Sequence, residues 1–258
     1  MWGKFYCMKI SHIVTNGCSF TYGNGLAKPK EQAWPHLLAN KLGVDVVNLG
    51  KPAAGNDTIF RRTYEYFYED LVNQNNPFYV IMFSSATRKE RWHNDKRQYE
   101  TLSPLGNESD PGVVDYLHHY DLKHYIKQTM HYKSAVKNLF DAHNIPYLFL
   151  TSINDLHSHE IRSMRESISK QMPNHLFLQT NDINDIGDAS ALTKDLPRTK
   201  CMHWVLEGHI KVADYVFDHM HKNYGPLEIE PTKNYMSVED YRNLMKEHLP
   251  FITARSGI

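Results

Sequence analysis

The sequence of 258 residues is long enough to bury a sizeable core, and its 41% hydrophobic and 22% charged residues are typical of a globular chain. Lysine plus arginine and aspartate plus glutamate number 29 each, so no net field recruits nucleic acid or an anionic membrane, and we expect neither partner. The three cysteines, Cys7, Cys18 and Cys201, form no disulfide framework, which indicates a reducing compartment.

The N-terminal segment 1–14 carries Lys4 and Lys9 inside an apolar stretch and has no small-residue cleavage site. It resembles neither a secretory signal nor a membrane span. We therefore expect a cytoplasmic location.

Short β-branched or aromatic runs predict buried strands. They cover residues 12–15, 44–48, 78–83, 146–151 and 175–179. Helical patterns lie between these runs, at 32–42, 57–73, 125–143 and 159–171, and each is long enough for a crossover connection. The alternation predicts the α/β class with a five-stranded parallel sheet. Ligands bind beyond the carboxyl ends of such strands, so the loops that follow them are where chemistry is expected.

Two segments lie outside this alternation. Residues 92–123 are long and irregular for a connection and rich in Tyr and His, so we interpret them as an insertion that covers the active-site face. After a domain at 1–225, residues 226–258 form a C-terminal helical extension whose helix, 238–248, is capped by Ser237. This extension packs either on the domain or on a second subunit, and the sequence leaves the oligomeric state open.

The loop after the first strand reads NGCSFTYG over residues 16–23. A small-residue turn there presents the hydroxyl of Ser19 as a nucleophile, provided that a neighbouring base removes its proton. The alternative is that Ser19 caps a turn.

A candidate base lies near the other end of the chain. His203 precedes a helical pattern formed by Val212, Ala213 and Val216 with the residues that follow, so it sits on a loop and can reach another loop. His209 falls within the helix on its apolar side, where a packing role is expected.

These segments together resemble the SGNH (GDSL-like) hydrolases. The run GCSFT at 17–21 is similar to the first block of that family, NLGKPAAGND at 48–57 to the second, and His203 with the GH pair at 208–209 to the last. The resemblance implies a flavodoxin-like, three-layer α/β/α sandwich. It also implies a Ser19 nucleophile, a His203 base and an oxyanion site formed by the backbone amides of Ser19 and Gly55.

The substrate side of the site is less regular. Asn56 lines the site or caps the next helix. The family often places an Asn after the third strand, where this chain has SSATRKE at 84–90. Thr87 is the expected replacement donor, and Arg88 orients that loop or meets an anionic substrate group.

The expected acid of the triad is also missing from its place. The family's usual Asp falls at Lys200 or Cys201, and a carboxylate would orient the imidazole and stabilise the imidazolium. Asp195 is the candidate replacement. The sequence leaves open whether Cys201 substitutes for the acid or only packs.

The resemblance predicts a serine esterase that removes a short acyl group, acetyl-like, from a small-molecule or glycan ester. The Tyr and His residues of the insertion suit a polar ligand, which favours a carbohydrate. The alternative is a non-catalytic binding or structural protein that keeps the fold. We expect no cofactor, and a metal hydrolase is disfavoured because the chain has no His-Glu-x-x-His run.

The GCSFT run together with Arg88 is similar to SGNH-type proteins of tailed phages and of bacteria. A phage origin would imply an association with the virion.

Overall fold

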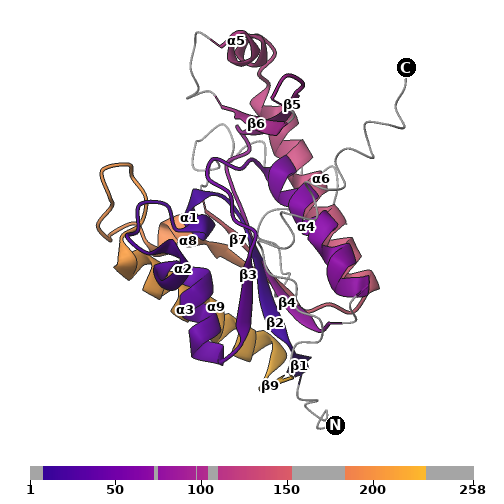
Figure 1. Ribbon diagram of the computed structural model, residues 1–258, viewed down its shortest axis with the longest axis vertical. Coiled ribbons are helices and arrows are strands. Elements are labelled where there is room, and N and C mark those ends of the chain that lie inside the picture. Colours follow the sequence, from indigo (N-terminus) through magenta and orange to yellow (C-terminus); the bar gives the residue numbers. More distant parts are fainter. Residues whose placement is uncertain (1–7, 73–74, 97, 104–109, 153–183, 231–258) are drawn as a thin grey trace.

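The computed structural model describes residues 8–72, 75–96, 98–103, 110–152 and 184–230. The sequence folds around one central parallel sheet with helices on both of its faces (Figure 1). The strands of this sheet, in spatial order, are β3 (Asp45–Asn48), β2 (His12–Asn16), β4 (Pro77–Phe83), β7 (Tyr147–Thr151) and β8 (Asp185–Asp188).

All neighbouring pairs in this sheet are parallel, and the order is that of the flavodoxin-like folds. The predicted α/β class and five-stranded parallel sheet are confirmed. Four predicted strands are found within a residue of their expected bounds. The fifth prediction, 175–179, lies outside the described residues, and the strand that completes the described sheet is β8.

The central strand β4 shows why these runs form buried strands. Side chains alternate across a strand, so each face of a two-sided sheet needs its own apolar residues. Phe78, Val80 and Met82 join the core on one face, whereas Tyr79 and Ile81 join the core on the other.

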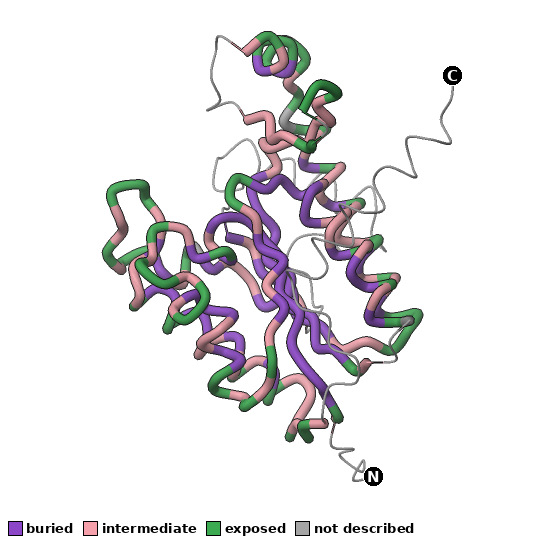
Figure 2. The backbone as a smooth tube through the Cα atoms, in the orientation of Figure 1, coloured by how far each residue is buried: buried purple, intermediate pink, exposed green. Residues whose placement is uncertain are grey.

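Two pairs of long helices form the outer layers. Helices α3 (Trp34–Leu42) and α9 (Leu206–Tyr224) pack together on one face, and α4 (Asn56–Val72) and α6 (Leu122–Ala142) pack together on the other. Their inner sides are buried and their outer sides exposed (Figure 2). Shorter helices are α1 (Ser19–Tyr22), α2 (Pro29–Gln32), α5 (Pro111–His118) and α8 (Ala189–Leu192). The helix predicted at 159–171 lies outside the described residues.

The segment expected to be irregular contains regular structure instead. Strands β5 (Lys89–His93) and β6 (Gln98–Leu102) form an antiparallel hairpin, followed by α5. The rings of the cross-strand pair Trp92 and Tyr99 lie 5.0 Å apart, a contact that stabilises such hairpins. Asp110 caps α5 by accepting a hydrogen bond from Gly112 N at 2.7 Å. Figure 1 shows hairpin and helix projecting beyond the carboxyl ends of the central strands.

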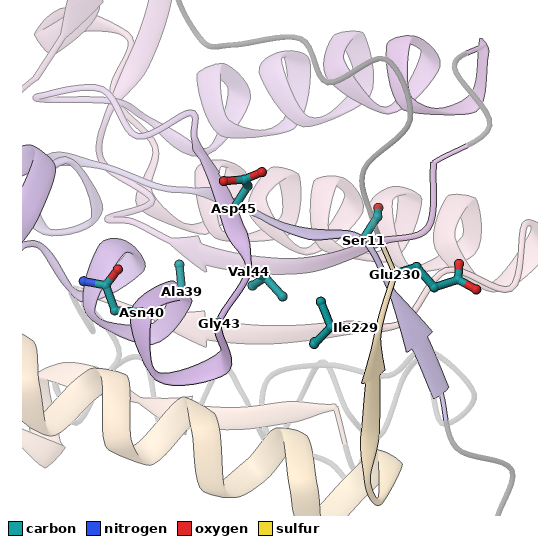
Figure 3. Close-up of a pocket in the computed structure, with 8 residues that line it drawn as sticks. All are labelled: Ser11, Ala39, Asn40, Gly43, Val44, Asp45, Ile229 and Glu230. Atoms are coloured by element: carbon teal, nitrogen blue, oxygen red, sulfur yellow. The ribbon is translucent and has the colours of Figure 1, made fainter.

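The opposite end of the sheet holds a small second sheet. Strands β1 (Met8–Ile10) and β9 (Leu227–Ile229) pair in parallel, so the beginning of the expected C-terminal extension contacts the domain. Beside them lies a cavity of about 500 Å³. Its lining residues come from the end of β9 and the residue after it, from α3 and the turn that leads into β3, from the first residue of β3, and from Ser11 just before β2 (Figure 3). The helix predicted at 238–248 lies outside the described residues.

No helix in the described part of the chain is both long enough and apolar enough to cross a membrane.

Candidate functional site

The loop after β2 is held rigidly at its base. Asn16 is buried and its side-chain amide donates to Ile59 O and to Thr63 Oγ1, both at 2.9 Å. Its carbonyl oxygen accepts from Gly17 N at 2.8 Å. A Cβ on Gly17 would lie 2.2 Å from Thr21 Oγ1, so the turn requires glycine. The end of β2 is therefore pinned to α4 before the chain turns.

Ser19 is the first residue of α1 and is only 4% exposed. Its carbonyl accepts from Gly23 N at 3.0 Å and Asn24 N at 2.9 Å. Its hydroxyl and its backbone N–H form no hydrogen bond with any residue that the structure describes. Both groups are thus available to a ligand at the carboxyl end of β2.

His203 lies on a tight loop between α8 and α9. An antiparallel bridge between Arg198 and Trp204 closes the loop, and Thr199 N donates to His203 O at 2.8 Å. Met202 has a φ of +64°, a left-handed conformation that costs energy for a residue with a side chain. The loop is therefore held in one geometry by its own backbone.

The environment of His203 favours the neutral form of its imidazole. Burial lowers the pKa of His203 below the ordinary value of 6.5; a hydrogen bond at Cys201 opposes this, and the positive charges of Arg88 and Arg198 lower it further. A neutral imidazole is the form that accepts a proton.

Phe20 connects the two loops. Its ring centroid lies 5.0 Å from that of His203 and 4.5 Å from that of Trp204. Phe20 also packs against the hydrophobic cores of both faces of the sheet. The fold thus brings the loops of Ser19 and His203 together from opposite ends of the chain, although Ser19 and His203 form no hydrogen bond with each other.

Gly55 precedes α4, and its N–H donates no hydrogen bond to a described residue. A Cβ there would lie 2.6 Å from Arg88 O, so glycine lets the loops after β3 and β4 approach each other. Asn56 is buried and bridges the same loops. Its amide donates to Ser84 O and to Thr129 Oγ1, both at 3.0 Å, and its carbonyl oxygen accepts from Ser84 N at 2.7 Å. Both amide hydrogens of Asn56 are therefore already used within the protein.

Thr87 and Arg88 follow β4. The Thr87 hydroxyl is hydrogen-bonded to that of Ser85 at 2.6 Å, and its carbonyl accepts from Tyr116 OH at 2.5 Å. The Arg88 guanidinium donates to Ser84 Oγ at 3.1 Å, and no described carboxylate pairs with it. Arg88 thus has an unneutralised charge near the base.

Asp195, the candidate triad acid, forms no hydrogen bond or ion pair with His203. Asp195 is exposed in the turn after α8. Among the described residues, the partner of His203 Nδ1 is Cys201, whose Sγ lies at 3.2 Å. The proximity of Phe20 and Arg198 to His203 was not predicted, because it depends on how the two loops meet.

His209 has the packing role expected for it. It is completely buried, and its Nδ1 accepts from Trp34 N at 3.2 Å. Burial is the main reason that its pKa falls to about 4. A Cβ on Gly208 would lie 2.8 Å from Trp204 Cβ, so the GH pair serves the packing of α9.

No group of three or more His, Cys, Asp or Glu side chains in the described ranges is arranged to hold a metal ion.

Solved structures share the fold. A carbohydrate esterase family 2 enzyme with a carbohydrate-binding domain, from Corynascus thermopiles (Myceliophthora fergusii), is 12% identical, with a TM-score of 0.50 over 84% of this chain and 67% of that one. TesA is 14% identical, with a TM-score of 0.48 over 82% of this chain and 99% of that one. A G-D-S-L lipolytic-family protein from Desulfitobacterium hafniense DCB-2 is 14% identical, with a TM-score of 0.44 over 81% and 99%. At such identities the similarity concerns the fold alone.

No curated protein matches this sequence. One family model matches residues 23–167, with the description "Family of unknown function (DUF6071)". The matched range includes Gly55, Asn56, Thr87 and Arg88 but neither Ser19 nor His203. Since the match covers more than half of the sequence, the chain belongs to the DUF6071 family.

Proposed function

We propose that the chain is a serine ester hydrolase with Ser19 as its nucleophile and His203 as its general base. The proposal rests on two available groups that lie on neighbouring loops. The Ser19 hydroxyl has no hydrogen-bond partner among the described residues. The imidazole of His203, whose lowered pKa favours the neutral form, packs against the ring of Phe20. Catalytic contacts are often long in an unliganded site and tighten around the substrate.

The reaction follows from these positions. The Ser19 oxygen attacks the ester carbonyl while Nε2 of His203 takes the hydroxyl proton, and the backbone N–H groups of Ser19 and Gly55 receive the oxyanion. Nε2 then returns the proton to the departing alcohol, leaving an acyl group on Ser19. A water molecule, deprotonated by the same nitrogen, releases the acid and restores the hydroxyl.

A short acyl group on a carbohydrate is the proposed substrate class. The Corynascus enzyme, whose TM-score is 0.50, is a carbohydrate esterase, which supports this choice at the level of the fold. The projecting hairpin also carries the exposed Tyr99, and tyrosine rings suit sugar faces. Tyr116, in contrast, is buried and serves the structure.

Arg88 is proposed to bind a negatively charged part of the substrate. Its guanidinium has a hydroxyl partner but no carboxylate among the described residues, unlike Arg91, which pairs with Glu100 at 3.2 Å. A carboxylate or phosphate near the ester would neutralise the positive charge of Arg88.

A non-catalytic binding or virion protein is the second candidate. It is favoured because Ser19 and His203 form no hydrogen bond with each other and because Asp195 is exposed and forms no hydrogen bond or ion pair with His203. The two functions differ in one measurable property, which is ester hydrolysis that depends on Ser19.

The test is hydrolysis of p-nitrophenyl acetate and butyrate by the wild type, Ser19→Ala, His203→Ala and, as control, His119→Ala, which removes an exposed histidine on the projecting segment. We expect the first two substitutions to lower kcat by about 10³-fold or more, with the control unchanged. Activity that survives Ser19→Ala would refute the nucleophile. If a folded wild type hydrolyses neither these esters nor acetylated sugars, the binding protein is favoured.

A further inference from the structure

We propose that Cys201 is a positioning residue that takes the place of the triad acid and orients His203 through its sulfur. This inference rests on the proposed esterase function. It assigns a role that the sequence left undecided between substitution and packing.

The contacts of Cys201 place its sulfur on the correct side of the imidazole. Cys201 Sγ lies 3.2 Å from His203 Nδ1, within the distance accepted for a hydrogen bond to sulfur. The hydroxyl of Thr199 lies 3.1 Å from the same sulfur. A triad acid binds Nδ1 in the same way, because this leaves Nε2 unprotonated and facing the nucleophile.

The loop backbone fixes this pairing. Residues 199–203 are closed by the bridge between Arg198 and Trp204, and Met202 accepts a positive φ so that the chain can turn back between Cys201 and His203. A Cβ on Gly25 would lie 3.6 Å from Cys201 Sγ, so the segment after α1 borders the sulfur. The backbone therefore fixes the spacing of Cys201 and His203, although the cysteine side chain itself is exposed.

The proton balance is that of a triad. Ser19 loses its hydroxyl proton to Nε2, and the proton on Nδ1 remains there, donated to the sulfur. The sulfur stabilises the resulting imidazolium as a thiolate and gains no proton. Unlike a carboxylate, a thiol must first ionise to supply this charge, so the contribution of Cys201 depends on pH.

Two cationic side chains and one neutral histidine face His203. Arg88 approaches from the loop after β4, Arg198 from the base of the loop, and the buried His209 from α9. The hydrogen bond from Thr199 is the main cause that holds the pKa of the Cys201 thiol below its ordinary value, and the backbone N–H groups of His203 and Cys201 add to it.

The same geometry also describes a cysteine–histidine dyad in which Cys201 is itself the nucleophile. The two roles make opposite predictions for an aspartate at position 201. An aspartate orients and charges the imidazole better than a thiol, but it does not replace a thiolate nucleophile.

The test measures kcat against pH for the wild type, Cys201→Asp, Cys201→Ala and Ser19→Ala. Cys201→Ala should lower kcat by about 10²-fold or more, whereas Cys201→Asp should stay within about 10-fold of the wild type. The wild-type profile should show a second rise below the ordinary thiol pKa of about 8.5, and this rise should be absent from Cys201→Asp.

Three results would overturn the inference. The first is a wild-type kcat and pH profile in Cys201→Ala. The second is a folded Cys201→Asp variant as inactive as Cys201→Ala, which would make Cys201 the nucleophile. The third is a second rise that persists in Cys201→Asp. Ser19→Ala tests the esterase proposal separately, because its outcome does not depend on position 201.

A second measurement decides the inference even if no ester is hydrolysed. The ¹⁵N shifts of the His203 ring report which nitrogen carries the proton. We expect a proton on Nδ1 in the wild type and in Cys201→Asp, with a mixture of tautomers in Cys201→Ala. Identical ring shifts and titration in the wild type and Cys201→Ala would exclude the positioning role.

Discussion

Asn56 and Ser84 form two reciprocal hydrogen bonds at the carboxyl end of the sheet. The Asn56 amide donates to Ser84 O at 3.0 Å, and Ser84 N donates to the Asn56 side-chain carbonyl at 2.7 Å. The pair fastens the start of α4 to the end of β4. Replacing Asn56 with alanine leaves two buried backbone groups unpaired, which should lower the free energy of unfolding by about 2–4 kcal/mol. Urea denaturation of Asn56→Ala measures this loss.

Thr129→Val is the matched control, because it removes one hydroxyl partner of Asn56 at 3.0 Å and spares the pair with Ser84. We expect a loss of about 1 kcal/mol for this variant. If Asn56→Ala keeps the wild-type stability and only impairs ester hydrolysis, Asn56 acts as a substrate ligand instead of a brace.

The pH dependence of hydrolysis should show the lowered pKa of His203. Catalysis requires the neutral imidazole, so kcat/KM should fall on acidification only below pH 6.5, the ordinary pKa of histidine. Arg88→Gln removes a positive charge that disfavours the imidazolium, so the pKa of His203 should rise and the acid limb should move to higher pH. A pH profile of Arg88→Gln that coincides with the wild-type profile would place Arg88 too far from His203 to act on it.

The proposed charge preference of the site can be measured with two esters that share an acyl group. Hydrolysis of 4-acetoxybenzoate, an anion, should lose about 10-fold or more in kcat/KM on Arg88→Gln, as expected for an interaction worth about 1.4 kcal/mol. The neutral methyl ester of the same compound should be affected much less. Arg91→Gln serves as the control because Arg91 already pairs with Glu100. Equal losses for both esters would mean that Arg88 orients its loop and does not recognise charge.

The projecting segment is tied to the site by the hydrogen bond from Tyr116 OH to Thr87 O. Tyr116→Phe keeps the ring, which packs near Tyr120 and Tyr125 at centroid distances of 5.7 and 5.6 Å, and removes this single bond. We expect faster amide exchange in α5 and in the loop after β4, with a stability loss of about 1 kcal/mol. Tyr120→Phe is the comparison, and an exchange pattern unchanged by Tyr116→Phe would show that the two regions are independent.

The sequence predicted the strands that are buried on both faces, because such strands need continuous apolar runs like the one at 78–83. Strand β8 was not predicted because its sequence, DIGD, is short and polar and because it lies at the edge of the sheet. The hairpin β5–β6 also escaped prediction, since KERWH begins with three consecutive charged residues and contacts with α4, such as Arg61 with Glu90 at 2.7 Å, hold the hairpin in place.

The candidate site was likewise predictable only where local sequence decides the structure. Local turn composition made Ser19 a candidate, and the helical pattern after His203 predicted its loop position. Cys201 lies two residues before His203, so the sequence suggested a contact between the sulfur and the imidazole without deciding it. The contact depends on the loop that the bridge between Arg198 and Trp204 closes. Asn56 was weighed between lining and capping, whereas its bonds reach Ser84 and Thr129, partners that are distant in sequence.

Phe20 follows the proposed nucleophile and packs against both hydrophobic cores as well as the His203 ring. A loosening of either helical layer should therefore reach the loops of Ser19 and His203 before the sheet itself separates. The proposed esterase activity should consequently decline at lower denaturant concentrations than the helical signal does, so activity would be lost while the protein is still largely folded. Stabilising substitutions far from the site, in either layer, would then extend the range of conditions under which the protein works.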